Sequence, residues 1–121
     1  MKVKELRIGN LLMDNLTGAI LRVDELTLDG KIVTYVIDRS LFPLPKGWKA
    51  EVIPLTDELL INFGFERSGM YFVKDQVYVY LAAHIAHDYE YRFNYTYTPI
   101  RYVHQLQNLY FFLTNKELCH D

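Results

Sequence analysis

Near the end of the chain stands the run Tyr102-Val103-His104-Gln105-Leu106-Gln107-Asn108-Leu109-Tyr110-Phe111-Phe112-Leu113-Thr114-Asn115-Lys116-Glu117-Leu118. Its apolar residues recur at i, i+3, i+4 and i+7, the spacing that places side chains on one side of a helix: Leu106, Leu109, Tyr110 and Leu113. An amphipathic helix of this kind is stable when its apolar side packs on another element. The rest of the chain is therefore expected to supply a surface for it.

The ends of this helix are marked by residues with known terminal preferences. Thr98 is predicted to be the N-cap and Pro99 the first helical residue, so the helix runs from Pro99 or Tyr102 to Leu113. Asn115 tolerates the left-handed conformation that commonly ends a helix. We therefore expect the helix to stop at Asn115.

The surface for this helix is predicted to come from a long strand, Tyr89–Tyr97. Aromatic residues occupy its odd positions and mostly polar residues its even ones, with the aromatics at Tyr89, Tyr91, Phe93, Tyr95 and Tyr97. A period of two places the two sets on opposite faces of a strand. We predict that the terminal helix covers the aromatic face.

Upstream of this strand, a short helix and two further strands are expected. Thr56 is the predicted N-cap of a helix over Asp57–Phe63, and Gly64 is its left-handed C-terminal residue. The strands Met70–Lys74 and Val77–Leu81 follow, so the second half of the chain should hold a three-stranded antiparallel sheet.

The first half reads as an antiparallel meander. Its expected strands are Arg7–Met13, Ala19–Leu28 and Lys31–Ile37, with Asp29-Gly30 as a tight hairpin turn between the last two. Both faces of the third strand are largely apolar, which favours a small SH3-like barrel over an open sheet. A short strand at Ala50–Ile53 is expected to return to it.

Length and composition place these elements in one α+β protein. The chain has 121 residues, of which 50% are hydrophobic and 23% charged, the balance of a globular domain. We predict a single compact domain over residues 1–121, with a barrel-like half at 1–54 and a helix, sheet and terminal helix at 55–121. The N-terminal barrel and the helix-covered sheet are its two parts.

Charge and cysteine content narrow the setting. The net charge of −2 provides no general attraction to nucleic acid or to an anionic membrane. One cysteine, Cys119, cannot form an internal disulfide, and residues 1–5 lack the apolar run of a secretion signal. The chain also has no apolar run of about 18 residues. We expect a cytoplasmic protein without a membrane partner.

Four blocks of the chain resemble one family. They are the opening run Lys4-Glu5-Leu6-Arg7-Ile8-Gly9-Asn10-Leu11, the closing run from Tyr102 to Thr114, and between them Leu55-Thr56-Asp57-Glu58-Leu59-Leu60 and Phe63-Gly64-Phe65. These blocks are similar to a family of small prophage and mobile-element proteins of anaerobic gut bacteria. The resemblance implies a phage-like source and a shared fold, and it implies no activity, ligand or cofactor.

Three histidines raise the question of a metal site. His84 and His87 are three residues apart beside Asp88, and His104 lies on the terminal helix. Imidazole and carboxylate together suit Zn²⁺, but no cysteine or second spaced histidine motif accompanies the pair. We interpret them as polar loop residues and predict no metal and no cofactor. With Cys119 near the end and no nucleophile elbow or phosphate loop, the chain is not expected to be an enzyme.

Two binding functions remain. A sheet with exposed aromatic residues can stack single-stranded nucleic acid, and the candidate contacts for it are Arg92, Arg101, Tyr91 and Tyr95. The basic residues beside this stripe are few, which favours the other function, a non-catalytic protein-interaction or assembly module. Its partner is another protein or a second copy of the chain, forming a homodimer. The candidate partner surface consists of apolar residues in excess of the expected core: Phe111, Phe112, Trp48 and Phe42. For Trp48 and Phe42, capping of the barrel end is the favoured role and the partner contact is the alternative.

Overall fold

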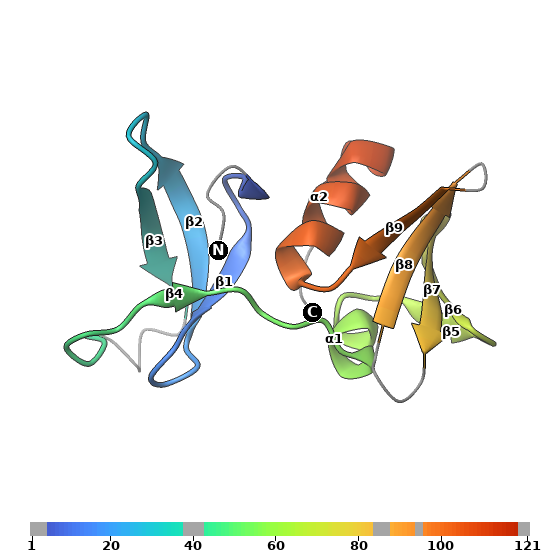
Figure 1. Ribbon diagram of the computed structural model, residues 1–121, viewed down its shortest axis with the longest axis horizontal. Helices are drawn as coiled ribbons and strands as arrows, with labels where there is room; N and C mark the ends of the chain where they lie inside the picture. The colour runs from blue at the N-terminus through green and yellow to red at the C-terminus, as the bar shows by residue number, and fades with distance from the viewer. Residues whose placement is uncertain (1–4, 38–42, 84–87, 94–95, 119–121) are drawn as a thin grey trace. The chain divides into compact units, whose positions relative to one another are not determined.

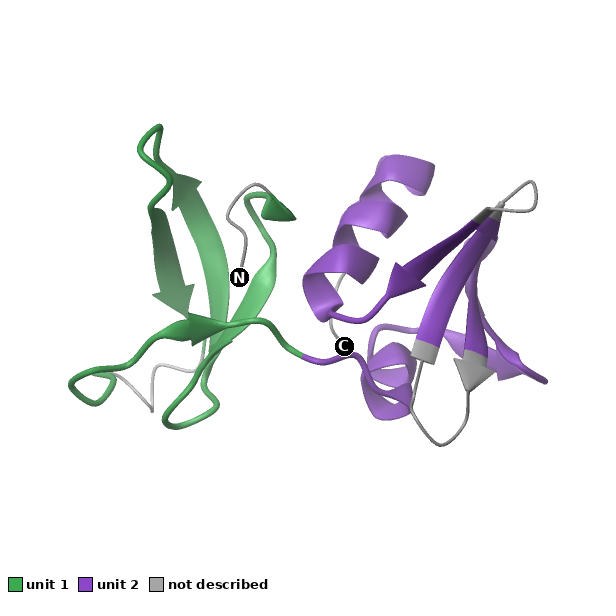
Figure 2. Cartoon of the chain, viewed as in Figure 1, with its two compact units in different colours: residues 1–53 green, residues 54–121 purple. Residues whose placement is uncertain are grey.

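The computed structural model describes residues 5–37, 43–83, 88–93 and 96–118. The chain divides into two compact units, Met1–Ile53 and Pro54–Asp121 (Figure 2). Their boundary lies one residue from the division at 54 and 55 that the sequence suggested. The fold is α+β, with two antiparallel sheets and two helices among the described residues. That both halves belong to one compact domain stays a prediction.

The first unit is a four-stranded antiparallel sheet in the order β3-β2-β1-β4 (Figure 1). Its strands are β1 (Leu11–Asp14), β2 (Ile20–Leu26), β3 (Ile32–Val36) and β4 (Ala50–Glu51). The hairpin at Asp29-Gly30 is confirmed, since β2 and β3 pair on either side of it and Gly30 has a φ of 85°. Apolar residues of one sheet face form the core of this unit, among them Leu12, Leu21, Val23 and Val36.

The predicted closed barrel is not confirmed. The described strands form an open sheet, in which β3 and β4 stand at opposite ends of the strand order. The barrel rested on both faces of the third strand being covered, but Val33, Tyr35 and Ile37 are exposed. The first strand also begins later than expected, at Leu11. The reason is a turn in which the side chain of Asn10 accepts the Arg7 backbone N–H at 2.6 Å.

The second unit begins with a helix, continues as a five-stranded antiparallel sheet and ends with a second helix. The helices are α1 (Asp57–Asn62) and α2 (Val103–Thr114). The strands follow one another in the sheet in chain order: β5 (Glu66–Ser68), β6 (Tyr71–Lys74), β7 (Val77–Ala83), β8 (Asp88–Phe93) and β9 (Thr96–Ile100). The sheet therefore has two more strands than the sequence predicted.

Both ends of α1 have the predicted caps. The hydroxyl of Thr56 accepts the Leu59 backbone N–H at 3.1 Å. Gly64 is left-handed with a φ of 92°, and the N–H groups of Gly64 and Phe65 donate to the carbonyls of Ile61 and Leu60. This pair of bonds is the Schellman arrangement, which satisfies two carbonyls that the helix itself cannot.

The predicted long strand Tyr89–Tyr97 is wrong. The chain reverses after Phe93, and β8 pairs antiparallel with β9 in a register that sets Phe93 opposite Thr96 and Tyr89 opposite Ile100. The predicted helix start at Pro99 with Thr98 as N-cap is wrong for the same reason, because both residues belong to β9. The alternative start is confirmed, since Tyr102 is the N-cap, and Asn115 ends α2 with a left-handed φ of 58°.

Helix α2 lies beside β9 (Figure 1), and one side of the helix is buried. The fully buried residues of this side are Val103, His104, Leu106, Gln107 and Tyr110. The side that the sequence predicted is rotated from it, because Leu109 is half-buried and Leu113 is exposed. The inner sheet face contributes buried residues from four of its strands: Phe72, Val77, Val79, Leu81, Tyr89 and Ile100. Together these residues form the core of the second unit, and the opposite face of the sheet is left exposed.

The close approach of the end of α1 to β6 generates a stability prediction. A Cβ placed on Gly64 would lie 2.9 Å from the Nζ of Lys74, which donates to the Phe63 carbonyl at 2.7 Å. Replacing Gly64 by alanine should therefore strain a left-handed residue and disturb this charged hydrogen bond, at a cost of about 2 kcal/mol. The loss is measured as the free energy of unfolding in urea.

Gly69 is the matched control, because its φ is also positive, at 61°, and no atom lies within 4 Å of its added Cβ. Gly69→Ala should cost about 1 kcal/mol, from backbone strain alone. Equal losses in the two variants would show that Lys74 does not matter at this position.

Candidate functional site

The exposed face of the second sheet carries a set of tyrosines. Residues paired across antiparallel strands lie on the same face, as do residues two apart in one strand. Tyr71 pairs with Tyr80, Tyr80 with Glu90 and Arg92 with Tyr97, while Tyr78 is two residues before Tyr80. The register thus places one group of side chains together, here named the tyrosine face: Tyr71, Tyr78, Tyr80, Arg92 and Tyr97.

These tyrosines are open to solvent and in contact with one another. Tyr71, Tyr78 and Tyr97 are 39%, 52% and 58% exposed, and Tyr80 is half-buried. The ring of Tyr71 lies 5.1 Å from that of Tyr80 and 6.0 Å from that of Tyr78, measured between centroids. Tyr71, Tyr78 and Tyr80 therefore form one cluster of contacting rings on this face.

Arg92 is the cation at the centre of this face. Its guanidinium carbon lies 3.6 Å from the centroid of the Tyr80 ring and 4.8 Å from that of Tyr97, a cation–π arrangement. Its Nε also donates to Glu90 at 2.7 Å. Desolvation lowers the pKa of Arg92. The hydrogen bond to Glu90 and the negative charge of Glu90 together raise this pKa by more, so the net shift is upward. Arg92 therefore stays charged, and Glu90 neutralises it.

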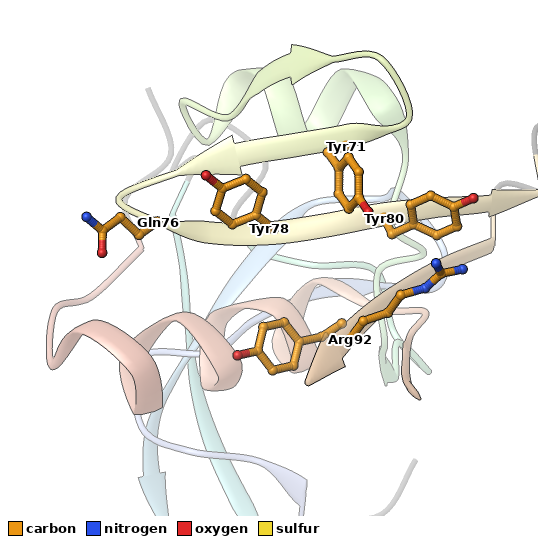
Figure 3. Close-up of a pocket in the computed structure, with 6 residues that line it drawn as sticks. Tyr71, Gln76, Tyr78, Tyr80 and Arg92 are labelled. Atoms are coloured by element: carbon orange, nitrogen blue, oxygen red, sulfur yellow. The ribbon is translucent and has the colours of Figure 1, made fainter. Parts of the chain in front are cut away.

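A groove of about 370 Å³ runs across this face. It is lined by Tyr71, Gln76, Tyr78, Tyr80, Tyr91 and Arg92. Figure 3 shows Tyr78 and Tyr80 spaced along β7, Arg92 on the neighbouring strand, and Gln76 beyond Tyr78 at one end. Gln76 stands in the hairpin turn between β6 and β7, where Asp75 and Gln76 both have positive φ, 49° and 67°. Aromatic walls with a few polar groups are typical of a binding groove.

Buried tyrosines on the other side of the sheet have a different role. Tyr89 is 2% exposed, and its hydroxyl donates to the carboxylate of Asp57 at the start of α1. Burial raises the pKa of the Tyr89 hydroxyl well above its usual value, as do the hydrogen bond to Asp57 and its charge. Tyr89 is therefore a neutral structural residue and takes no part in the exposed face.

The sequence-predicted nucleic-acid contacts are only partly brought together. Arg92 and Tyr91 both line the groove, although Tyr91 is half-buried and by register belongs with Tyr89 to the other face of β8. Arg101 is exposed after the end of β9 and does not belong to the lining. Tyr95 lies outside the described residues.

The predicted partner residues belong to different parts of the chain. Phe112 is 84% exposed near the end of α2, and the neighbouring Phe111 is half-buried. Trp48 is exposed in a loop of the first unit, before β4. Phe42 lies outside the described residues. Each unit is described by itself, so Phe112 and Trp48 are two separate candidate contacts.

The histidines considered for a metal are not brought together in the part of the chain that is described. His84, His87 and Cys119 lie outside that part, as does the side chain of Asp88, and His104 is buried on α2. Among the described residues, no three histidine, cysteine or acidic side chains form a group that could hold a metal ion. No described helix is long and apolar enough to cross a membrane.

Sequence reasoning missed most of the tyrosine face. A signal for it was present in the strand Val77–Leu81, where Tyr78 and Tyr80 alternate with Val77, Val79 and Leu81. That alternation predicts one buried aliphatic face and one exposed tyrosine face. The contribution of Tyr97 had no such local signal, since its face depends on the reversal between β8 and β9.

The assignment of tyrosines to two faces can be tested by nitration with tetranitromethane, which modifies accessible phenolates. Tyr78 and Tyr97 should be modified first, because they are the most exposed tyrosines of the sheet. Tyr89 should react last, because it is buried and its pKa is raised. Peptide mapping by mass spectrometry gives the order. Equal rates at Tyr89 and Tyr97 would instead support one continuous strand.

Comparisons with known proteins add no relative. No protein-family model, no curated protein and no solved structure matches this chain. The chemistry of the tyrosine face and its groove is therefore the basis for proposing a function.

Proposed function

We propose that this protein is a non-catalytic interaction module that binds another protein through the tyrosine face. The observation that carries the proposal is the cluster of exposed tyrosines around Arg92, which lines a groove on a rigid sheet. Tyrosine and arginine are enriched among the residues that dominate protein–protein binding energy. Tyrosine also offers a large contact area with little side-chain entropy to lose.

The lining of the groove supports binding rather than catalysis. Its described members are tyrosines, one glutamine and one arginine, and none of them is a carboxylate, histidine, cysteine or serine. A hydrolytic or group-transfer site generally needs a nucleophile with a nearby base. The residues present are suited to packing and to hydrogen bonding with a partner.

Single-strand nucleic-acid binding is the second candidate, because exposed tyrosines on a sheet can stack on bases. Charge argues against it. Arg92 is the cation of the groove lining, and its partner Glu90 cancels that charge locally. Binding to a phosphate backbone depends on several cations that release counterions. Nucleic acid would therefore need a partner protein to supply them.

The wider setting is also a proposal. The resemblance of the opening and closing runs to prophage and mobile-element proteins supports an accessory role in such an element. The absence of a second cysteine for a disulfide supports a cytoplasmic location. Both points concern where the module acts and leave its binding chemistry unchanged.

Selection from a displayed library of random peptides tests the binding function. The immobilised full chain should enrich peptides whose binding, measured by calorimetry, falls at least tenfold in Tyr78→Ala, since hot-spot residues contribute more than about 1.4 kcal/mol. Tyr78 is half exposed, so its removal should leave the fold intact, as circular dichroism would show.

Tyr35→Ala is the matched control, because Tyr35, like Tyr78, is an exposed tyrosine of a strand, but it belongs to the first unit. It should leave affinity unchanged. If no peptide is enriched while a thymidine 15-mer binds and depends on Tyr78, the nucleic-acid function is the correct one. Equal losses of affinity in Tyr78→Ala and Tyr35→Ala would show that the tyrosine face binds neither peptides nor nucleic acid.

A second contact is proposed at the end of α2, where Phe112 and Leu113 are 84% and 40% exposed. Such apolar area on a helix favours association with a second copy of the chain. Phe112→Ser should therefore shift the sedimentation equilibrium toward monomer without loss of stability. Ile61→Ser is a control at another exposed apolar helix residue. A wild-type chain that stays monomeric at high concentration contradicts this contact.

A further inference from the structure

The geometry points to a ligand class for the groove: a short proline-rich peptide segment in the polyproline II conformation. This inference rests on the proposed function, since it names the kind of protein segment that the tyrosine face binds. Four features of the described residues carry it, namely the backbone pairing of the sheet, the donors of the lining, the length of the groove and its charge.

Backbone pairing excludes a ligand that adds as a strand to this site. The groove lies on the face of β7, and β7 is already paired with β6 on one side and β8 on the other. Its ladder groups are therefore used within the sheet. A peptide on this face must leave its own amides to water or to side chains. A polyproline II segment has a fully solvated backbone without internal hydrogen bonds, and its prolines have no N–H to satisfy.

Every polar side chain of the lining can donate a hydrogen bond. The Arg92 guanidinium has donors only, whereas the Gln76 amide and the tyrosine hydroxyls can both donate and accept. The carboxylate of Glu90 already accepts a hydrogen bond from Arg92. A ligand rich in carbonyl groups therefore finds a donor at each of these side chains. Proline-rich segments have this composition.

The aromatic residues set the shape and length of the site. Tyr78 and Tyr80 stand two residues apart on β7, and Gln76 precedes them at the end of the groove. From Val77 to Tyr80 the strand rises about 10 Å, since Gln76 belongs to the turn before it. A polyproline II segment of about three residues covers that distance, at about 3.1 Å per residue. Its pyrrolidine rings would pack on the phenol rings, as in other aromatic-lined grooves for such peptides.

Charge agrees with a neutral ligand. The positive charge of Arg92 is balanced by Glu90 at 2.7 Å, and the other lining residues are uncharged. An anionic ligand would lose hydration without a net attraction here, and a cationic ligand would be repelled by Arg92. A neutral proline-rich segment avoids both costs.

The test is an NMR titration of the ¹⁵N-labelled full chain with a blocked decamer of proline and, separately, with a blocked glycine–serine decamer. Saturable shifts are expected with the proline peptide alone, at the amides of residues 76–80 and 90–92. Tyr78→Ala should weaken this binding at least tenfold and Tyr35→Ala less than twofold. Tyr78→Phe keeps the ring and loses the hydroxyl, so it should weaken binding less than Tyr78→Ala does.

Several outcomes would overturn the ligand class. They are an absence of saturable shifts at about 1 mM peptide, the weak end of specific binding, equal shifts with both decamers, and shifts confined to other residues. If library-selected peptides without proline bind through Tyr78 while the proline decamer does not, the class is wrong and the interaction module stands. If both kinds of peptide fail and a thymidine 15-mer shifts the same amides, the module itself is wrong.

Discussion

The second unit depends on a constraint on tyrosine: a phenol ring can be buried only if its hydroxyl keeps a hydrogen-bond partner. Two buried tyrosines meet it with carboxylates. Tyr89 of β8 donates to Asp57 at the start of α1, and Tyr110 of α2 donates to Asp75 in the turn after β6. Each bond ties one helix to the sheet. The members of the tyrosine face stand on the other, exposed side of the sheet, so the same residue type builds both the core and the proposed binding surface.

The bond between Tyr110 and Asp75 links the core to the groove. Asp75 and its neighbour Gln76 form the turn between β6 and β7, both with positive φ, a conformation that costs about 1 kcal/mol or more for a residue other than glycine. The acceptor role of Asp75 offsets part of that cost from the inner side. Lys74 adds to the same region, since its ammonium lies 5.6 Å from the Tyr110 ring centroid. Gln76 is thereby held at the end of the groove. The contacts of α2 on the buried face of the sheet thus determine the position of a groove residue on the exposed face.

Local signals predicted the local elements well. The caps of α1, the turn at Asp29-Gly30 and the left-handed end of α2 all follow from side chains acting within a few residues. The prediction of one strand over Tyr89–Tyr97 failed because β8 and β9 are separate antiparallel strands, and their register pairs odd-numbered residues with even-numbered ones. In β8 the odd residue Tyr89 is buried, whereas in β9 its partner is the even residue Ile100, and the odd residue Tyr97 is exposed. The alternation in the sequence continues from β8 into β9, so periodicity alone could not reveal that there are two strands.

The candidate site was harder to predict because its central contact combines three strands. Arg92 of β8 meets Tyr80 of β7 and Tyr97 of β9, and its role as a stacked, neutralised cation depends on the register of both pairings. From the sequence, Arg92 was a candidate nucleic-acid contact for the alternative function, on the assumption that its charge was available. In the folded sheet, Glu90 and two phenol rings hold the guanidinium in place. A side chain held in this way loses little entropy on binding, which agrees better with the proposed recognition of a neutral partner than with attraction of an anionic one.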